Sequence, residues 1–132
     1  MRRMILAFFL LVTALFSFSQ DSPQYRACMD KAKAQMQMNA CTGQEDARVD
    51  AAMNKVYQQL LAKAASDQDA VAKIKAAERA WVAYRDAYLE AMYPAKDKAT
   101  EYGSIYPMDL ALLRAKLTRQ HITDLQELMK EQ

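Results

Sequence analysis

The sequence predicts an all-α protein, an antiparallel three-helix bundle with a short N-terminal helix linked to it by a disulfide. Glycine and proline are scarce, with 2 glycines and 3 prolines among 132 residues, so few positions interrupt a long helix. Apolar residues recur at the 3.6-residue period of a helix, and no stretch shows the alternation typical of a strand. The two cysteines predict the link to the short helix.

The first residues have the pattern of a secretory leader. Arg2 and Arg3 precede an almost entirely apolar stretch, 4–18, which is too short to span a bilayer comfortably. Small residues at its end place the expected cleavage site after residue 19. The sequence therefore predicts a signal peptide over residues 1–19. One soluble, exported helical domain follows over residues 20–132, with no membrane span after cleavage.

Removing the leader changes the charge balance of the protein. The full chain has 18 Lys and Arg residues against 16 Asp and Glu residues. Because the leader contains two of the arginines, the mature protein has equal numbers of both signs and a net charge near zero. No basic cluster remains that would indicate nucleic-acid binding. About 110 mature residues are enough for one domain with a single core.

The two cysteines, Cys28 and Cys41, are most simply one disulfide in an exported chain. In one continuous helix the rise over thirteen residues would separate them by about 20 Å, too far for a bridge. A first helix over residues 24–31 must therefore be followed by a chain reversal near residues 33–35. The pair is a poor metal site, because no histidine lies nearby and two thiolates do not complete a tetrahedral ligand set.

The second helix is expected from about residue 35 to residue 65, because its apolar residues follow i, i+3, i+4, i+7 spacing. Gly43 costs about 1 kcal/mol relative to alanine, which leaves room for a kink near Cys41. Ser66 or Asp67 is expected to cap the next helix. The apolar residues of the second helix are Val49, Met53, Val56, Tyr57, Leu60, Leu61 and Ala64.

The third helix, expected over residues 69–92, contains the only tryptophan of the chain. Trp81, Tyr84 and Tyr88 fall on one helical face, and an uncovered stripe of this kind would be a large apolar patch. We therefore expect other helices to bury the stripe, with polar partners for the tyrosine hydroxyls at its edge. The expected structural core motif comprises Trp81, Tyr84, Arg85 and Asp86.

Pro94 is expected to end the third helix and to begin a loop over residues 94–107. Within this loop Tyr102, Gly103, Ser104, Ile105 and Tyr106 are the best candidates for contact with a partner protein, because loops carry recognition more often than scaffolds do. Alternatively, Gly103 only permits the turn and Tyr106 closes the end of the bundle. A last helix is expected from Pro107 or Met108 to about Lys130, with an inner side of leucines: Leu110, Leu113, Leu117, Leu125 and Leu128.

Several motifs of the mature chain match one family pattern in order. They are Cys28, Met38-Asn39-Ala40-Cys41, Asp50-x-x-Met53-Asn54-x-x-Tyr57-x-x-Leu60, Ala80-Trp81-Val82-Ala83-Tyr84-Arg85-Asp86, Gly103-Ser104-Ile105-Tyr106-Pro107 and Leu117-Thr118-x-x-His121. This order resembles the family named for the lysozyme inhibitor LprI, and it covers essentially the whole mature chain. The resemblance implies binding and inhibition of lysozyme in the cell envelope, in a periplasmic or secreted protein. It also supports the pairing of the two cysteines.

One departure from the family pattern bears on the packing of the helices. Many members have a second cysteine pair, and Leu89 and Leu113 occupy the corresponding positions here. We expect an apolar contact between the third and the last helix to replace that covalent link.

Three functions of different classes are consistent with such a chain. The first is inhibition of a lysozyme-type muramidase, and the second is a structural or adaptor module that binds another envelope protein through a bundle face. The third, a metal or haem carrier, is prompted by the methionines. However, Met36 and Met38 lie two residues apart and point in different directions on a helix, which favours core filling over ligation.

No enzymatic activity and no cofactor are predicted. A catalytic role for Glu78 or Asp86 would need a second carboxylate or a nucleophile placed beside it, and the sequence indicates neither. His121, the only histidine, is interpreted as a polar helix residue.

Overall fold

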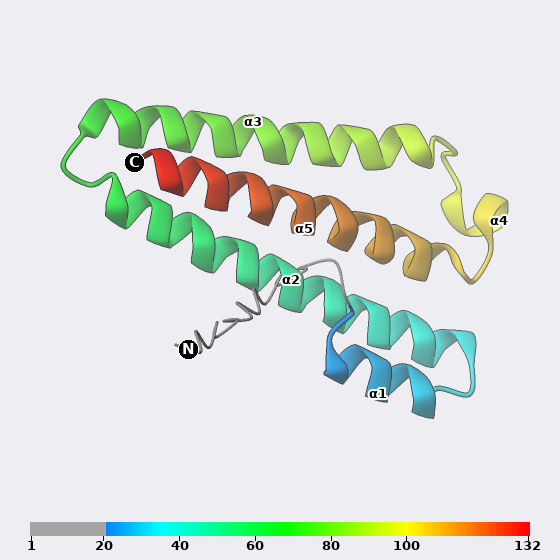
Figure 1. Cartoon of the computed structure of the whole chain (residues 1–132). Helices are drawn as coiled ribbons and strands as arrows, with labels where there is room; N and C mark the ends of the chain where they lie inside the picture. The colour runs from blue at the N-terminus through cyan, green and yellow to red at the C-terminus, as the bar shows by residue number, and fades with distance from the viewer. Residues whose placement is uncertain (1–20) are drawn as a thin grey trace, which may run out of the picture.

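The computed structural model describes residues 21–132, and these residues form helices and no strand (Figure 1). The predicted all-α fold is therefore confirmed, whereas the predicted signal peptide lies outside the described residues. In Figure 1, α3 runs antiparallel to α2 and α5, and α5 lies between them. The helices are α1 (Pro23–Lys31), α2 (Gln35–Lys63), α3 (Gln68–Met92), α4 (Lys98–Tyr102) and α5 (Tyr106–Glu131).

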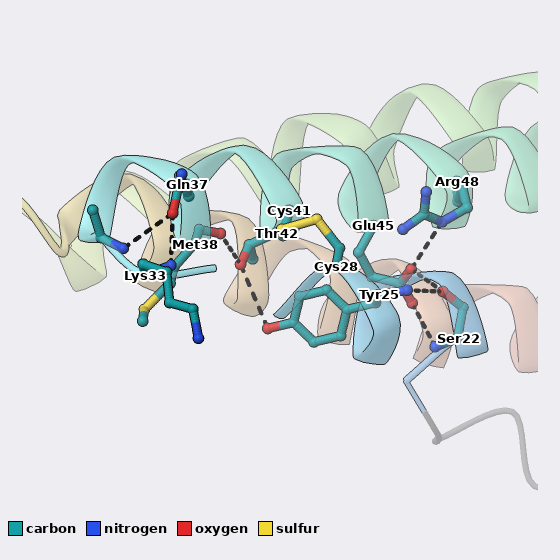
Figure 2. The surroundings of a disulfide bond; sticks show 11 residues. Ser22, Tyr25, Cys28, Lys33, Gln37, Met38, Cys41, Thr42, Glu45 and Arg48 are labelled. Carbon is teal, nitrogen blue, oxygen red and sulfur yellow. Dashed lines mark hydrogen bonds and ion pairs between the residues drawn. A yellow bond between two sulfur atoms is a disulfide. The ribbon is translucent and has the colours of Figure 1, made fainter. Parts of the chain in front are cut away.

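Helix α1 turns back along the first half of α2, as the cysteine spacing predicts (Figure 1). It begins at Pro23, where the Ser22 hydroxyl accepts a hydrogen bond from the backbone N–H of Tyr25 at 3.1 Å. The reversal lies between Lys31 and Gln35. The predicted disulfide is present and joins Cys28 to Cys41 across the two helices, with their Cα atoms 5.7 Å apart (Figure 2).

Helix α2 is continuous from Gln35 to Lys63, so Gly43 does not break it. Its buried side packs on α5, and together the two helices form most of the core. The fully buried positions include Leu60 on α2 and Ile122 on α5, with exposed fractions of 0% and 1%. Small residues lie beside them on α5, where Ala115 and Thr118 are each 1% exposed. Small side chains let the backbones of two helices approach closely.

The inner side of α5 differs from the predicted row of leucines. Leu125 is buried as expected, whereas Leu110, Leu113, Leu117 and Leu128 are only half-buried. The other buried positions of α5 hold alanine, threonine, histidine and isoleucine, so large and small side chains share the contact with α2. These positions are Ala111, Ala115, Thr118, His121 and Ile122.

Helix α3 is much less covered than α2 or α5. Asp67 caps it, as predicted, by accepting a hydrogen bond from the backbone N–H of Ala70 at 3.0 Å. Its fully buried residues are Ile74 and Leu89. Leu113, the expected partner of Leu89, is half-buried on α5.

The predicted loop over residues 94–107 is wrong in part, because Lys98–Tyr102 form the short helix α4. Asp97 caps this helix: its carboxylate accepts hydrogen bonds from the backbone N–H of Thr100 at 3.0 Å and from the Thr100 hydroxyl at 2.8 Å. These bonds lower the pKa of Asp97. The Asp-x-x-Thr spacing is a helix-start signal that predicts this turn.

None of the helices formed by residues 21–132 has the length and apolar character needed to cross a membrane.

Candidate functional site

The tip, which we define as Gly103, Ser104 and Ile105, connects α4 to α5 at one end of the molecule (Figure 1). Gly103 has a φ of 73°, a backbone conformation that favours glycine and lets the chain leave α4 sharply. All three tip residues are exposed, and the Ile105 side chain is 42% exposed. An exposed isoleucine on a tight turn is available for an apolar contact with a partner.

Three tyrosines form a cluster beneath the tip. The ring centroid of Tyr93 lies 5.3 Å from that of Tyr102 and 5.1 Å from that of Tyr106, both in edge-to-face geometry. The Tyr102 and Tyr106 centroids are 5.6 Å apart. Such aromatic pairs contribute about 0.5–1.5 kcal/mol each beyond the area they bury. Burial, followed by the nearby Asp109 carboxylate and the two other tyrosines, raises the pKa of Tyr93.

Hydrogen bonds fix the tip to its neighbours. The side-chain amide of Asn39, on α2, donates to the Ser104 carbonyl oxygen at 3.0 Å. The Gln35 amide donates in turn to the Asn39 side-chain oxygen at 2.8 Å, which orients Asn39. On the other side, the Tyr102 hydroxyl accepts from the backbone N–H of Ala95 at 3.1 Å. The side chains of the tip are therefore exposed, while hydrogen bonds hold its backbone in place.

The structure brings the five predicted partner-binding residues, Tyr102 to Tyr106, to one end of the bundle, although it divides them into two groups. Gly103, Ser104 and Ile105 are exposed, whereas Tyr102 and Tyr106 are half-buried in the tyrosine cluster. The two tyrosines thus support the tip from inside. Whether the five residues bind a partner remains a prediction.

Sequence reasoning missed two residues of this region, Tyr93 and Asn39. Tyr93 directly precedes Pro94, and its aromatic character was a usable signal because two other tyrosines follow within the same segment. Asn39 stands in the motif Met38-Asn39-Ala40-Cys41, but no local pattern pairs it with Ser104, which lies 65 residues further along the chain.

The aromatic stripe predicted on α3 is only partly correct. Trp81 is half-buried and stacks on His121 of α5, with ring centroids 3.8 Å apart and an interplanar angle of 5°. Tyr84 and Tyr88, in contrast, are 58% and 37% exposed, so their predicted place in the core is wrong. The reason is that α3 contacts its neighbours along a line through Ile74, Trp81 and Leu89, and the tyrosines lie on the flank of that line.

Polar residues fill the inward positions of α3 between its apolar ones. Glu78 lies 2.7 Å from His121, through Glu78 Oε2 and His121 Nε2, and both side chains are nearly buried. Arg85 lies over the Trp81 ring, with its guanidinium carbon 5.3 Å from the ring centroid. Arg85 also pairs with Asp86 at 2.9 Å. Glu78 is thus paired within the bundle, whereas Asp86 pairs with the adjacent Arg85 at the surface, where its side chain is 59% exposed.

A buried carboxylate on α2, Glu45, joins three helices. Figure 2 shows its contacts with Ser22 and Arg48. It accepts hydrogen bonds from the backbone N–H and the hydroxyl of Ser22, at 3.0 and 2.6 Å, where α1 begins. It also accepts from Arg48 at 3.0 Å and from Arg119 of α5 at 2.6 Å. Burial alone would raise the pKa of Glu45, but the bonds from Ser22 and Arg48 and the charge of Arg119 outweigh it and lower the pKa.

A groove of about 380 Å³ lies between α2, α3 and α5, lined in part by Asp46 and Asp50. Its charged side chains neutralise one another: Arg114 pairs with Asp46 at 2.6 Å, and Arg85 lies 3.9 Å from Asp50. Within residues 21–132, no group of three or more His, Cys, Asp or Glu side chains is arranged to hold a metal ion. The tip, with the exposed Ile105 on a backbone held by Asn39, is the candidate site for recognition.

Comparison with known proteins assigns this architecture to a family. The family model described as "Lysozyme inhibitor LprI" matches residues 28–125, which include both cysteines, the Trp81 motif and the tip. A protein of Rhizobium meliloti (strain 1021), named "Uncharacterized protein R02472", is 34% identical over 137 residues, covering 95% of this chain and 92% of the relative. No solved structure matches the chain.

Proposed function

The chain belongs to the LprI lysozyme-inhibitor family, and from this premise we propose that it binds lysozyme-type muramidases and inhibits them. The family is a family of inhibitors rather than of enzymes. The proposed action is therefore stoichiometric binding that blocks the partner, with no reaction at the surface of this chain.

The proposed place of action is outside the cytoplasm, in the periplasm or the secreted fraction. Family membership and the Cys28–Cys41 disulfide both favour an extracytoplasmic location, because such bonds form and persist in oxidising compartments. A signal peptide over residues 1–19 would direct the export, and the domain from residue 20 onward would be the active form.

The proposed contact surface is the tip. The observation that carries this proposal is that Ser104 and Ile105 are exposed while the backbone is held on one side by Asn39 and on the other by the tyrosine cluster. A surface that is already fixed loses little conformational entropy when it binds.

A lysis assay tests the proposal. The mature protein, exported with its own leader, is added to bacterial cell walls with muramidases of several lysozyme classes, and the fall in turbidity is followed. At least one class should be inhibited in proportion to the protein added. Undiminished lysis by every class at a large molar excess of the protein would overturn the proposed function.

Variants of the tip test the contact surface separately. The double variant S104R/I105D should weaken inhibition by at least tenfold, since a charge replaces the apolar contact and a bulky cation occupies the turn. Q58R/Q59D is the matched control, because it makes the same changes of charge at exposed positions near the C-terminal end of α2. The tyrosines are left intact, because their loss would also destabilise the fold. Equal inhibition by both variants would move the contact away from the tip.

A further inference from the structure

The outward face of α3 is apolar and uncovered. Its large apolar side chains are Tyr84 and Tyr88, which are 58% and 37% exposed and lie along one flank of the helix. Beside them lies a row of exposed alanines at helical spacing, Ala76, Ala80, Ala83, Ala87 and Ala91. Small side chains in such a row would allow another helix to approach closely.

The basic and acidic residues along one edge of this face lie at opposite ends of α3. Lys75 and Arg79 lie in the first half of α3, and Asp86 and Glu90 lie in the second half along the same edge, so the face is basic at one end and acidic at the other. Among the described residues, Lys75 and Arg79 have no ion-pair partner. Asp86 and Glu90 pair with Arg85 and Lys98, but their side chains stay 59% and 70% exposed.

This charge order fits a second copy of the same helix in the opposite direction. We propose that α3 is a self-association surface, through which two copies of this chain pair antiparallel about a two-fold axis near Val82 and Ala83. In this register Arg79 faces Asp86 of the second copy and Lys75 faces its Glu90, each twice by symmetry. A parallel pair would place like charges opposite each other.

The apolar residues agree with the same register. Tyr88 lies opposite Ala77 of the second copy, so a large ring meets a small side chain on both sides of the axis. The paired length is that of α3, 25 residues or about 37 Å. One helix pair of this length is at the lower end of stable interfaces, near roughly 1,200 Å² in total, so the expected dissociation constant is on the order of micromolar. The balanced mature charge adds no general repulsion between the copies.

Sedimentation equilibrium of the mature protein over a range of concentrations tests the proposal. The wild-type protein should be mostly dimeric at a protein concentration roughly ten times its expected micromolar dissociation constant. R79E and D86K should each weaken the dimer by at least tenfold, because like charges then face each other twice. K55E, on an exposed part of α2, is the control for R79E and should dimerise like the wild type.

Mixing the two variants distinguishes specific contacts between residues 79 and 86 of two copies from a general effect of net charge on association. In a mixed dimer of R79E and D86K, both contacts of the proposed register join opposite charges, so a heterodimer should form where neither variant pairs with itself. Thermal melts of each variant check that the fold is intact. A wild-type protein that stays monomeric at on the order of 1 mM would overturn the proposal. A failure of the mixture to associate would overturn the antiparallel register.

Discussion

Helices α1, α2 and α5 differ sharply from α3 and α4 in how they are held. On the first side the disulfide, the Glu45 contacts and the core around Leu60 and Ile122 join the helices at several points. On the second side, α3 is fixed mainly through Ile74, Leu89 and the stacked Trp81. The contrast teaches that the tightly held side of this small domain differs from the side that carries most of its exposed large apolar residues, which belong mostly to α3 and the tip.

The largest expected effect comes from the shared core of α2 and α5. Leu60→Ala should lower the free energy of unfolding by about 4 kcal/mol, because the side chain is fully buried and its removal leaves a cavity. Val82→Ala, at a half-buried position of α3, should cost about 1 kcal/mol. Urea unfolding measures both values. Equal losses would contradict the contrast between the two sides.

The disulfide should have the next largest effect. In the chain-entropy model, closing a loop between residues 13 apart contributes about 3 kcal/mol, so C28S/C41S should lose about that much. Chemical denaturation followed by circular dichroism measures the loss, and reducing agent added to the wild-type protein should reproduce it. A variant as stable as the wild type would show that the noncovalent contacts of Ser22 and the buried Tyr25 are enough to hold α1.

Glu45→Gln should cost about 2 kcal/mol near pH 7, because it removes a buried charge paired with two arginines. The pKa of Glu45 in the folded protein is below its ordinary value of 4.5. Its stabilisation is therefore complete above that value and is lost as the pH falls through the lower, folded-state pKa. Wild type and variant should converge in stability in acid, whereas exposed Glu127→Gln should match the wild type throughout. If the difference in the free energy of unfolding between wild type and Glu45→Gln were the same at all pH values, this role of Glu45 would be contradicted.

The smallest expected effect belongs to the exposed face of α3. Tyr84→Ala should change the free energy of unfolding by no more than about 0.5 kcal/mol in dilute solution, where the chain is monomeric. Thermal and urea unfolding at low protein concentration measure the change. A loss of several kcal/mol would show that the tyrosine packs in the core, as its spacing with Trp81 had predicted.

The helices and the disulfide could be predicted from the sequence because their signals are local. Apolar spacing defines α2 and α5, Asp67 marks the start of α3, and thirteen residues between the cysteines require a reversal. The short helix α4 also had a local signal, Asp97 followed by Thr100, although a segment that begins with proline favours the interpretation as a loop.

The partners of polar residues could not be predicted in the same way. Glu45 meets Ser22 and Arg119, which lie 23 and 74 residues away in the chain, and no periodic pattern specifies such contacts. Burial on α3 was misassigned for a related reason. The Arg85 side chain is only 14% exposed and lies over the Trp81 ring, so the contact line of the helix passes through a polar position and leaves Tyr84 outside.

The direction of α5 has a consequence for display of this protein on a surface. The tip precedes its first residue and the C-terminus follows its last, so the two lie at opposite ends of a helix of 26 residues (Figure 1). At 1.5 Å per residue this helix is about 39 Å long. A chain attached to a bead or a sensor chip through its C-terminus should therefore hold the tip roughly 4 nm from the support. Attachment at that end leaves the tip open to a large partner without any added spacer.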